Sequence, residues 1–430
     1  MSAREMSLRG FLAAAFGSEE RQMTMRTAKG GERVGLLGYG TMRLPTVDGG
    51  HANPWGDNSS KAAIDQSAVN AHIDYALEHG VNYFDTSPAY CRGEAETVLG
   101  KALGRHPRDR HYIATKLSNF AASQYSAKKC REMFERSLTC LQTDYIDFYL
   151  LHNVGMGGFE AFRRRYIDNG IIPWLFEQKK KGRIRNIGWS YHGDPKAVEW
   201  LLQRHDAGEY VWDFAQIQMN YIDWRHAREM NANNLNADYL YGELDRRGIP
   251  VVVMEPLLGG RLARHNEAVA AELTPLDPES TPASWALRFC GSYPRVLTVL
   301  SGMTFKEHLV ENVRTFSPLH PLGPSELAVL ERAAQAYLGF GAIPCNSCNY
   351  CMPCPYGLDI PGLLTFMNRV RVDRLTEAKV IRREYAKAVP DPRRRADRCI
   401  GCERCLGHCP QSIDIPRALD GIAQFMEDLI

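Results

Sequence analysis

Short apolar runs alternate with longer amphipathic stretches from residue 34 to about residue 316. A brief run rich in Val, Ile, Leu and Tyr predicts a buried strand, and a stretch with apolar residues every three or four positions predicts a helix. Eight runs are strand candidates: residues 34–40, 81–84, 112–115, 146–151, 184–188, 214–217, 251–254 and 296–300. Eight strands that alternate with helices predict an α/β fold, the TIM (β/α)8 barrel.

Polar side chains stand at the ends of several of these runs. They are Asp85, Lys116, His152, Ser190, Gln216 and Ser301. In such barrels the carboxyl ends of the strands and their loops build the active site. We expect the longer connections, at residues 46–65, 153–170 and 222–238, to overhang that face and to determine substrate specificity.

The pattern changes near residue 340. Residues 324–338 predict one more helix, after which glycines and prolines interrupt the chain and eight of its twelve cysteines follow between positions 345 and 409. We therefore expect an N-terminal extension at residues 1–22, a barrel at residues 23–339 and a small C-terminal domain at residues 340–430.

The cysteines of the C-terminal domain form two runs of four. They are Cys345, Cys348, Cys351 and Cys354, and then Cys399, Cys402, Cys405 and Cys409. Three cysteines at two-residue intervals with a fourth before a proline are typical of two-cluster ferredoxins, in which the fourth cysteine ligates the other cluster. This spacing predicts one [4Fe–4S] cluster on Cys345, Cys348, Cys351 and Cys409, and a second on Cys399, Cys402, Cys405 and Cys354.

One spacing departs from that pattern, because two residues and not three precede Cys354. A pair of structural zinc sites is the alternative, since C-x2-C pairs also bind zinc. Three evenly spaced cysteines closed by Cys-Pro favour iron–sulfur clusters. Residues 361–389 have a helical composition, so the domain resembles the α-helical dicluster ferredoxins.

Composition and charge limit the classes of molecule that this protein is expected to bind. The chain has 430 residues, with 52 Lys and Arg against 50 Asp and Glu, and its formal charge is +2. This balance predicts no binding to nucleic acid and favours a small-molecule partner. The apolar run at residues 10–16 is too short to span a membrane and lacks the flanks of a secretory signal, so we expect a cytoplasmic protein.

Four polar residues at strand ends fit the reduction of a carbonyl. Hydride addition leaves an alkoxide, which a general acid such as Tyr90 can protonate. The ammonium of Lys116 is expected to lower the pKa of that phenol, and Asp85 to hold Lys116 charged and oriented. His152 can hydrogen-bond the same substrate oxygen. Taken singly, each residue also has an ordinary structural interpretation.

In order and in strand position these four residues resemble the catalytic tetrad of the aldo-keto reductases. The resemblance extends over about residues 23–316 and implies NAD(P)H-dependent hydride transfer to or from a carbonyl or alcohol substrate. It implies that Ser190 and Gln216 hold the nicotinamide carboxamide and that Met254 takes the position of a ring-stacking aromatic. The implied nucleotide contacts are Ser190, Gln216, Met254, Pro256, Leu257, Ser301, Gly302, Lys306 and Asn312.

The resemblance favours NADP, with NAD as the alternative. Well-studied members of the family bind the 2′-phosphate with a lysine and an arginine, and this chain has Gly302 and His308 at those positions. Lys306 is the remaining nearby cation, at the start of a helix whose free N–H groups suit a phosphate.

The function of the clusters stays open at this stage. A nicotinamide delivers two electrons as hydride, a cluster passes one, and no flavin motif is visible. We therefore expect accessory clusters that serve a redox partner protein or the fold, and hydride transfer that is independent of them. The basic run 393–395 is a candidate docking patch or a solvated loop. The alternative function is an electron-transfer or partner-docking protein whose barrel senses nucleotide.

Overall fold

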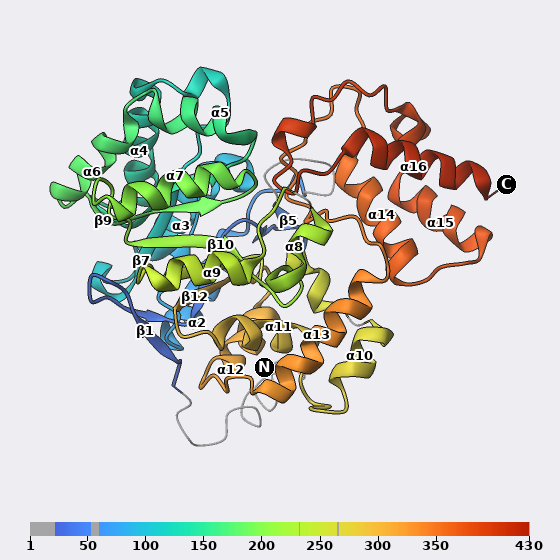
Figure 1. The fold of residues 1–430 in the computed structure, drawn as a ribbon, viewed down its shortest axis with the longest axis horizontal. Helices are drawn as coiled ribbons and strands as arrows, with labels where there is room; N and C mark the ends of the chain where they lie inside the picture. The colour runs from blue at the N-terminus through green and yellow to red at the C-terminus, as the bar shows by residue number, and fades with distance from the viewer. Residues whose placement is uncertain (1–21, 53–59, 232, 265, 430) are drawn as a thin grey trace.

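The computed structural model describes residues 22–52, 60–231, 233–264 and 266–429. Its centre is a closed barrel of eight parallel strands (Figure 1). The strands are β3 (Leu37–Gly40), β6 (Tyr83–Asp85), β7 (Tyr112–Leu117), β8 (Ile146–Val154), β9 (Ile184–Tyr191), β10 (Phe214–Gln218), β11 (Val251–Met254) and β12 (Val296–Ser301). The predicted TIM barrel and its eight strands are confirmed.

One element at the start of the barrel was not predicted. The first apolar run divides into β2 (Arg33–Gly35) and β3, and β2 pairs antiparallel with β1 (Met25–Thr27). Ala28 and Val34 of this hairpin pack with Tyr83 and Phe214, which are the first residues of β6 and β10. The hairpin therefore closes the amino end of the barrel and leaves its carboxyl end for the site.

Helices surround the barrel, as the alternating pattern predicts. They include α2 (Gln66–Glu78), α3 (Ala95–Leu103), α4 (Ala127–Leu141), α6 (Ile171–Lys180), α7 (Pro195–Asp206), α9 (Ala237–Arg246), α11 (Pro282–Gly291) and α12 (Lys306–Thr315). The first turns of four of these helices, α2, α4, α7 and α11, are capped by short polar side chains. Asp65 accepts a hydrogen bond from the N–H of Ala68, and Ser126 from that of Lys129. Each cap satisfies an N–H that would otherwise lack an intrahelical partner.

The loops predicted to overhang the site contain structure of their own. Residues 153–170 contain α5 (Gly158–Phe162) and a π-helical turn over Arg163–Ile167, and residues 222–238 contain α8 (Asp223–Met230). Residues 46–65 contain β5 (His51–Ala52), which pairs with β4 (Leu44–Pro45). Part of that loop, residues 53–59, lies outside the described residues, as does the predicted extension except for residue 22.

The C-terminal region has a hydrophobic core of its own. The barrel core ends with Tyr337 on α13 (Pro324–Leu338), which packs on α10 (Glu267–Leu273), and the second core begins with Met352. The second core is formed mainly by α14 (Ile360–Val372), α15 (Ala378–Ala388) and α16 (Ile415–Asp428). The predicted helical segment 361–389 is thus two helices.

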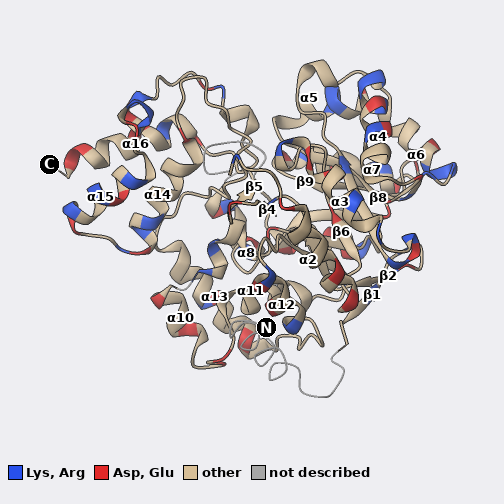
Figure 2. Cartoon of the chain, turned by 180° about the vertical axis from the view of Figure 1, so that it is seen from behind, with Lys and Arg blue, Asp and Glu red and all other residues tan. Residues whose placement is uncertain are grey.

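Charged residues of both signs are interspersed over the helices of the barrel (Figure 2). In the basic run 393–395, Arg393 pairs with Asp391 at 2.8 Å and Arg394 donates to the carbonyl of Gly357 at 2.6 Å. Two of the three arginines are therefore engaged within the C-terminal region. No helix of the described residues is long and apolar enough to cross a membrane.

Candidate active site

A cavity of about 250 Å³ opens at the carboxyl end of the barrel. Eleven of the predicted site residues line it: Asp85, Tyr90, Lys116, His152, Ser190, Gln216, Met254, Pro256, Leu257, Ser301 and Gly302. Lys306 and Asn312 do not line this cavity. Parallel strands bring their carboxyl ends to one face, and for that reason residues far apart in the sequence meet here.

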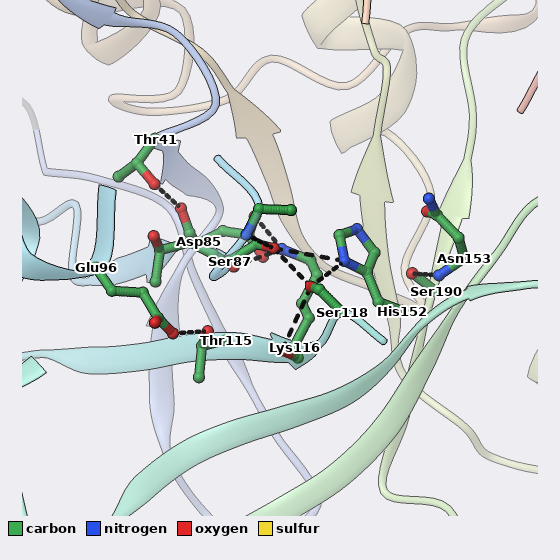
Figure 3. A network of polar contacts seen from close by, with 12 residues as sticks. Thr41, Asp85, Ser87, Glu96, Thr115, Lys116, Ser118, His152, Asn153 and Ser190 are labelled. Carbon is green, nitrogen blue, oxygen red and sulfur yellow. Dashed lines mark hydrogen bonds and ion pairs between the residues drawn. The ribbon is translucent and has the colours of Figure 1, made fainter. Parts of the chain in front are cut away.

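Lys116 is fixed by two oxygen atoms beneath the cavity. Its Nζ lies 2.6 Å from Oδ1 of Asp85 and donates to the carbonyl of Thr86 at 2.8 Å (Figure 3). Asp85 and Lys116 are 3 % and 1 % exposed. Two opposite charges held this deep are stable only as a pair. The Nζ of Lys116 also lies 4.8 Å from the centre of the Tyr90 ring.

Tyr90 is presented by a tight turn after β6. The three residues that follow it, Cys91, Arg92 and Gly93, all have positive φ angles. The turn is anchored by Cys91, whose Sγ lies 3.3 Å from the carbonyl oxygen of Thr41. This backbone directs the Tyr90 ring edge-on to His152, at 5.9 Å between ring centroids.

A pair of serines orients His152. The Nδ1 of His152 lies 2.6 Å from Oγ of Ser118, which in turn lies 2.8 Å from Oγ of Ser87. If Ser118 donates to Nδ1, the proton of the neutral imidazole is on Nε2. Beneath them the buried guanidinium of Arg165 donates to the carbonyl of His152 at 2.7 Å and to that of Asn153 at 3.1 Å.

Burial determines the protonation states of the site. It holds the pKa of His152 well below its usual value, and the neighbouring cations Lys116 and Arg165 lower it further. Burial also raises the pKa of Tyr90 well above its usual value, and Asp85 adds to this. Lys116 therefore does not bring the pKa of Tyr90 below its usual value in this structure; the net shift is upward. Asp85 neutralises the ammonium, and the cost of a buried phenolate is larger than the remaining attraction.

Among the residues predicted to bind nicotinamide, one buried polar atom has no hydrogen-bond partner within the described residues. The side-chain oxygen of Gln216 is buried and accepts no hydrogen bond from the described parts of the chain. The hydroxyl of Ser190, on the next strand, receives the N–H of Asn153 at 2.9 Å. A carboxamide NH2 group would satisfy the orphaned oxygen, so these residues fit the group that the sequence predicts.

The predicted phosphate end of the site lies at the start of α12. Asn312 donates to Oγ of Ser301 at 3.0 Å, so the two predicted contacts support each other. Lys306 is the first residue of the helix, and its Nζ lies 5.5 Å from the centre of the Tyr75 ring.

The cysteines of the C-terminal region gather in two groups that draw on both runs. Burial raises the pKa of Cys351, and the nearby thiols of Cys348, Cys345, Cys409 and Cys405 raise it further. Burial likewise raises the pKa of Cys405 to about 11, with contributions from Cys399, Cys402 and Cys354. These groups largely match the two sets of four that the spacing predicts, although Cys405 of the second set also lies near Cys351.

The donor set fits iron–sulfur clusters. Two of the thiols receive backbone N–H groups, from Ser347 to Sγ of Cys345 and from Ile413 to Sγ of Cys409, both at 3.5 Å. Such hydrogen bonds stabilise cluster thiolates. Among the described residues no three His, Cys, Asp or Glu side chains are close enough to hold one metal ion. A four-iron cluster places its ligands differently, because each thiolate binds its own iron.

The same cavity has a second wall that the sequence did not predict. Five residues of the cysteine-rich domain line it opposite the tetrad: Asn346, Cys348, Tyr350, Pro410 and Gln411. The expected independence of hydride transfer from cluster turnover stays a prediction, but the cysteine-rich domain forms part of the cavity itself. A chain ending near Leu338 would lack this wall.

Three residues that contact His152 or line the cavity were not predicted from the sequence: Ser118, Arg165 and Tyr350. Ser118 stands two positions after Lys116, so the alternation of a strand could have placed it on the same face. Arg165 lies within a run of three arginines, and Tyr350 within a cysteine motif. Neither has a local feature that points to the site.

Comparisons with known proteins agree with this geometry. The sequence model of the aldo/keto reductase family matches residues 36–334, and that of the 4Fe-4S dicluster domain matches residues 344–413. The L-galactose dehydrogenase of Arabidopsis thaliana is 26 % identical over 321 residues, which cover 70 % of this chain and 90 % of that protein. The D-arabinose 1-dehydrogenase of Saccharomyces cerevisiae is 36 % identical over 138 residues, 30 % of this chain and 38 % of that protein.

A solved structure has the same fold. The holo form of aldo-keto reductase AKR11C1 from Bacillus halodurans superposes with a TM-score of 0.57 at 25 % identity. The match covers 73 % of this chain and 97 % of that chain.

Proposed function

Because the chain belongs to the aldo/keto reductase family, we propose that it is an oxidoreductase that transfers hydride between a nicotinamide dinucleotide and a carbonyl or alcohol substrate. One observation carries the proposal. A buried Asp85–Lys116 pair, Tyr90 and a neutral His152 line the same cavity as the orphaned oxygen of Gln216.

The bound nucleotide would supply the hydride, and residues of the chain would supply the proton and position the substrate oxygen. Tyr90 donates its phenolic proton to the substrate oxygen, on which negative charge develops. A raised phenol pKa does not prevent this, because an alkoxide is a stronger base than a phenolate. His152 donates from Nε2 to the same oxygen and fixes its position. Lys116 stabilises the phenolate left on Tyr90.

We propose NADP as the nucleotide, with NAD as the alternative. Lys306 at the start of α12 is a cation suited to a 2′-phosphate, whereas Gly302 and His308 occupy the positions that bind it in well-studied members. Two relatives carry the names of sugar dehydrogenases, so aldoses and their simple carbonyl analogues are the first substrates to test.

The test is an anaerobic assay of the whole chain. NADPH and NADH are titrated by fluorescence, and a screen of aldehydes, ketones and aldoses follows the absorbance of the nucleotide in both directions. We expect saturable binding and turnover of at least one carbonyl or aldose. Nucleotide binding with no turnover of any member of the screen would favour a sensor over an enzyme.

The pH dependence should show a plateau. Reduction requires a protonated Tyr90, whose pKa is raised, and a neutral His152, whose pKa is lowered. The ordinary pKa values are 10.0 for tyrosine and 6.5 for histidine. Tyr90 therefore loses its proton only at a pH above 10, and His152 gains one only at a pH below 6.5. We therefore expect kcat for reduction to be flat between these limits. Alcohol oxidation, which needs the phenolate as base, should rise with pH over the same range. An inflection in the reduction profile inside that range would contradict these protonation states.

We further propose two [4Fe–4S] clusters, on Cys345, Cys348, Cys351 and Cys409, and on Cys399, Cys402, Cys405 and Cys354. The clusters would exchange single electrons. None of the twelve cysteines, all within the described residues, forms a disulfide, which fits a reducing, cytoplasmic setting.

Iron content tests the cluster assignment. We expect about eight irons per chain after anaerobic purification. Cys348→Ser and Cys402→Ser should each lower the iron content, whereas Cys140→Ser, on the barrel helix α4, should not. About four irons together with a harmless Cys354→Ser would show that one cluster is missing.

A second function, electron exchange with a redox partner protein, is favoured by one observation. Cys402 is exposed, and its neighbour Ile400 is 63 % exposed. The second cluster would therefore lie at the surface, within reach of a partner. Reduction of the clusters by NADPH, followed by their visible absorbance, separates a redox function from a structural one.

A further inference from the structure

The cysteine-rich domain is held against the mouth of the barrel by charged side chains. The guanidinium of Arg43 donates to the carbonyl of Asn346 at 2.9 Å, and that of Arg261 donates to Oδ1 of Asn346 and to the carbonyl of Ile343, both at 3.2 Å. These contacts fix the first cysteine loop from two sides.

The fit between the domains is close. A Cβ atom at Gly259, in the loop after β11, would lie 2.7 Å from the carbonyl oxygen of Asn346. On the other side of the mouth, Gln411 donates to the side-chain oxygen of Gln218 at 2.9 Å. Such packing leaves no room for a side chain at Gly259, and the cysteine-rich domain covers part of the cavity.

Within the part of the cysteine-rich domain that covers the cavity, Tyr350 lies between two hollows. It lines the 250 Å³ cavity of the tetrad and also a neighbouring cleft of about 740 Å³ between the two domains, where the four cysteines of the proposed second cluster, Cys354, Cys399, Cys402 and Cys405, lie. Its ring lies 5.6 Å from that of Phe120, which itself lies 5.0 Å from the His152 ring. The two aromatic rings therefore form a partition between the catalytic cavity and the cleft.

Building on the proposed hydride transfer, we propose that Tyr350 is a specificity-determining residue of the carbonyl pocket. Its ring closes the pocket on the side of Tyr90 and His152 and limits the size of the group attached to the carbonyl carbon. A small aldehyde fits within the cavity, whereas a bulky one needs space that the Tyr350 ring occupies.

The position of Tyr350 links substrate selection to the cluster loop. Tyr350 lies between two predicted ligands of the first cluster, Cys348 and Cys351, and follows Ser347 and Asn349, both with positive φ angles. A side chain on so short a loop has little freedom once the cysteines on either side are ligated. The carbonyl pocket is thus complete only when the cysteine-rich domain is folded.

The test uses the whole chain, purified anaerobically with its clusters. Tyr350→Ala should raise kcat/KM for a bulky aldehyde such as 2-naphthaldehyde, relative to propanal, by about tenfold or more, since one or two missing contacts in a pocket shift discrimination by this amount. Tyr350→Phe should keep the wild-type preference, and Tyr350→Trp should sharpen it. Tyr239→Ala, an exposed tyrosine on α9 that lines neither the cavity nor the cleft, is the control.

Readouts other than turnover separate specificity from a structural role. Iron content and the Kd for NADPH should stay within about twofold of wild type in all variants. Binding of the two aldehydes, measured by saturation-transfer NMR, should change in the same direction as kcat/KM, and it remains informative if the wild type reduces neither. In that case the proposed function fails, while tighter binding of the bulky aldehyde by Tyr350→Ala still supports the partition. An unchanged preference in both Tyr350→Ala and Tyr350→Trp, with clusters intact, would overturn the proposal.

Discussion

Replacing Tyr90 by phenylalanine is expected to lower kcat for carbonyl reduction by about 10²–10⁴-fold, the usual contribution of a positioned general acid. The substitution removes only the phenolic proton, and the ring keeps its edge-on contact with His152. The Kd for nucleotide should change little, because the hydroxyl acts on the developing alkoxide and not on the cofactor. Stopped-flow reduction together with a fluorescence titration measures both quantities.

Tyr83→Phe is the matched control for this variant. Tyr83 lies on the same strand as Asp85, and its hydroxyl is buried without a hydrogen-bond partner in the described part of the chain. It belongs to the core at the amino end of the barrel, away from the cavity. Its loss should leave turnover intact. Full activity in Tyr90→Phe would remove the tetrad from the mechanism.

Replacing Lys116 by methionine should have a large effect on both stability and activity. The variant leaves Asp85 buried without its partner, and breaking a buried pair in this way costs about 3–5 kcal/mol. We expect the thermal unfolding midpoint of the barrel to fall on the order of 10 °C. Intrinsic tryptophan fluorescence reports this unfolding selectively, because all seven tryptophans precede residue 339. Reduction should also become slower, since the phenolate of Tyr90 loses its cation.

Two further variants test whether the lost partner is the cause. Asp85→Leu combined with Lys116→Met removes both charges and should recover much of the lost stability, but none of the activity. Lys129→Met breaks an exposed pair with Glu132 and should change the midpoint little. A midpoint for Lys116→Met equal to that of Lys129→Met would show that the Asp85–Lys116 pair does not hold the barrel together.

Much of this molecule could be predicted from its sequence, because the relevant signals are local. The strand runs and the helices between them follow from periodicities of two and of three to four residues, and burial of the apolar positions then closes the barrel. Asp85, Lys116 and His152 could be identified because each lies at or near the carboxyl end of a strand, and parallel strands bring these ends together. The two sets of cysteines follow from their spacing in the same way.

Other features were decided by tertiary structure alone. The pKa of Tyr90 depends on how completely the fold excludes water from it, and no sequence motif carries that information. The position of Arg165 beneath His152 depends on a π-helical turn in a loop.

The cover over the active site is the clearest case. The sequence by itself determined a barrel with a tetrad and a domain with eight cysteines, since each is specified by residues near one another along the chain. It did not determine that the two share one cavity. That contact rests on Arg43, Arg261 and Gly259 meeting Asn346 across a long stretch of chain. Docking of two folded surfaces depends on their shape and on a few polar groups, which become neighbours only after each domain has folded.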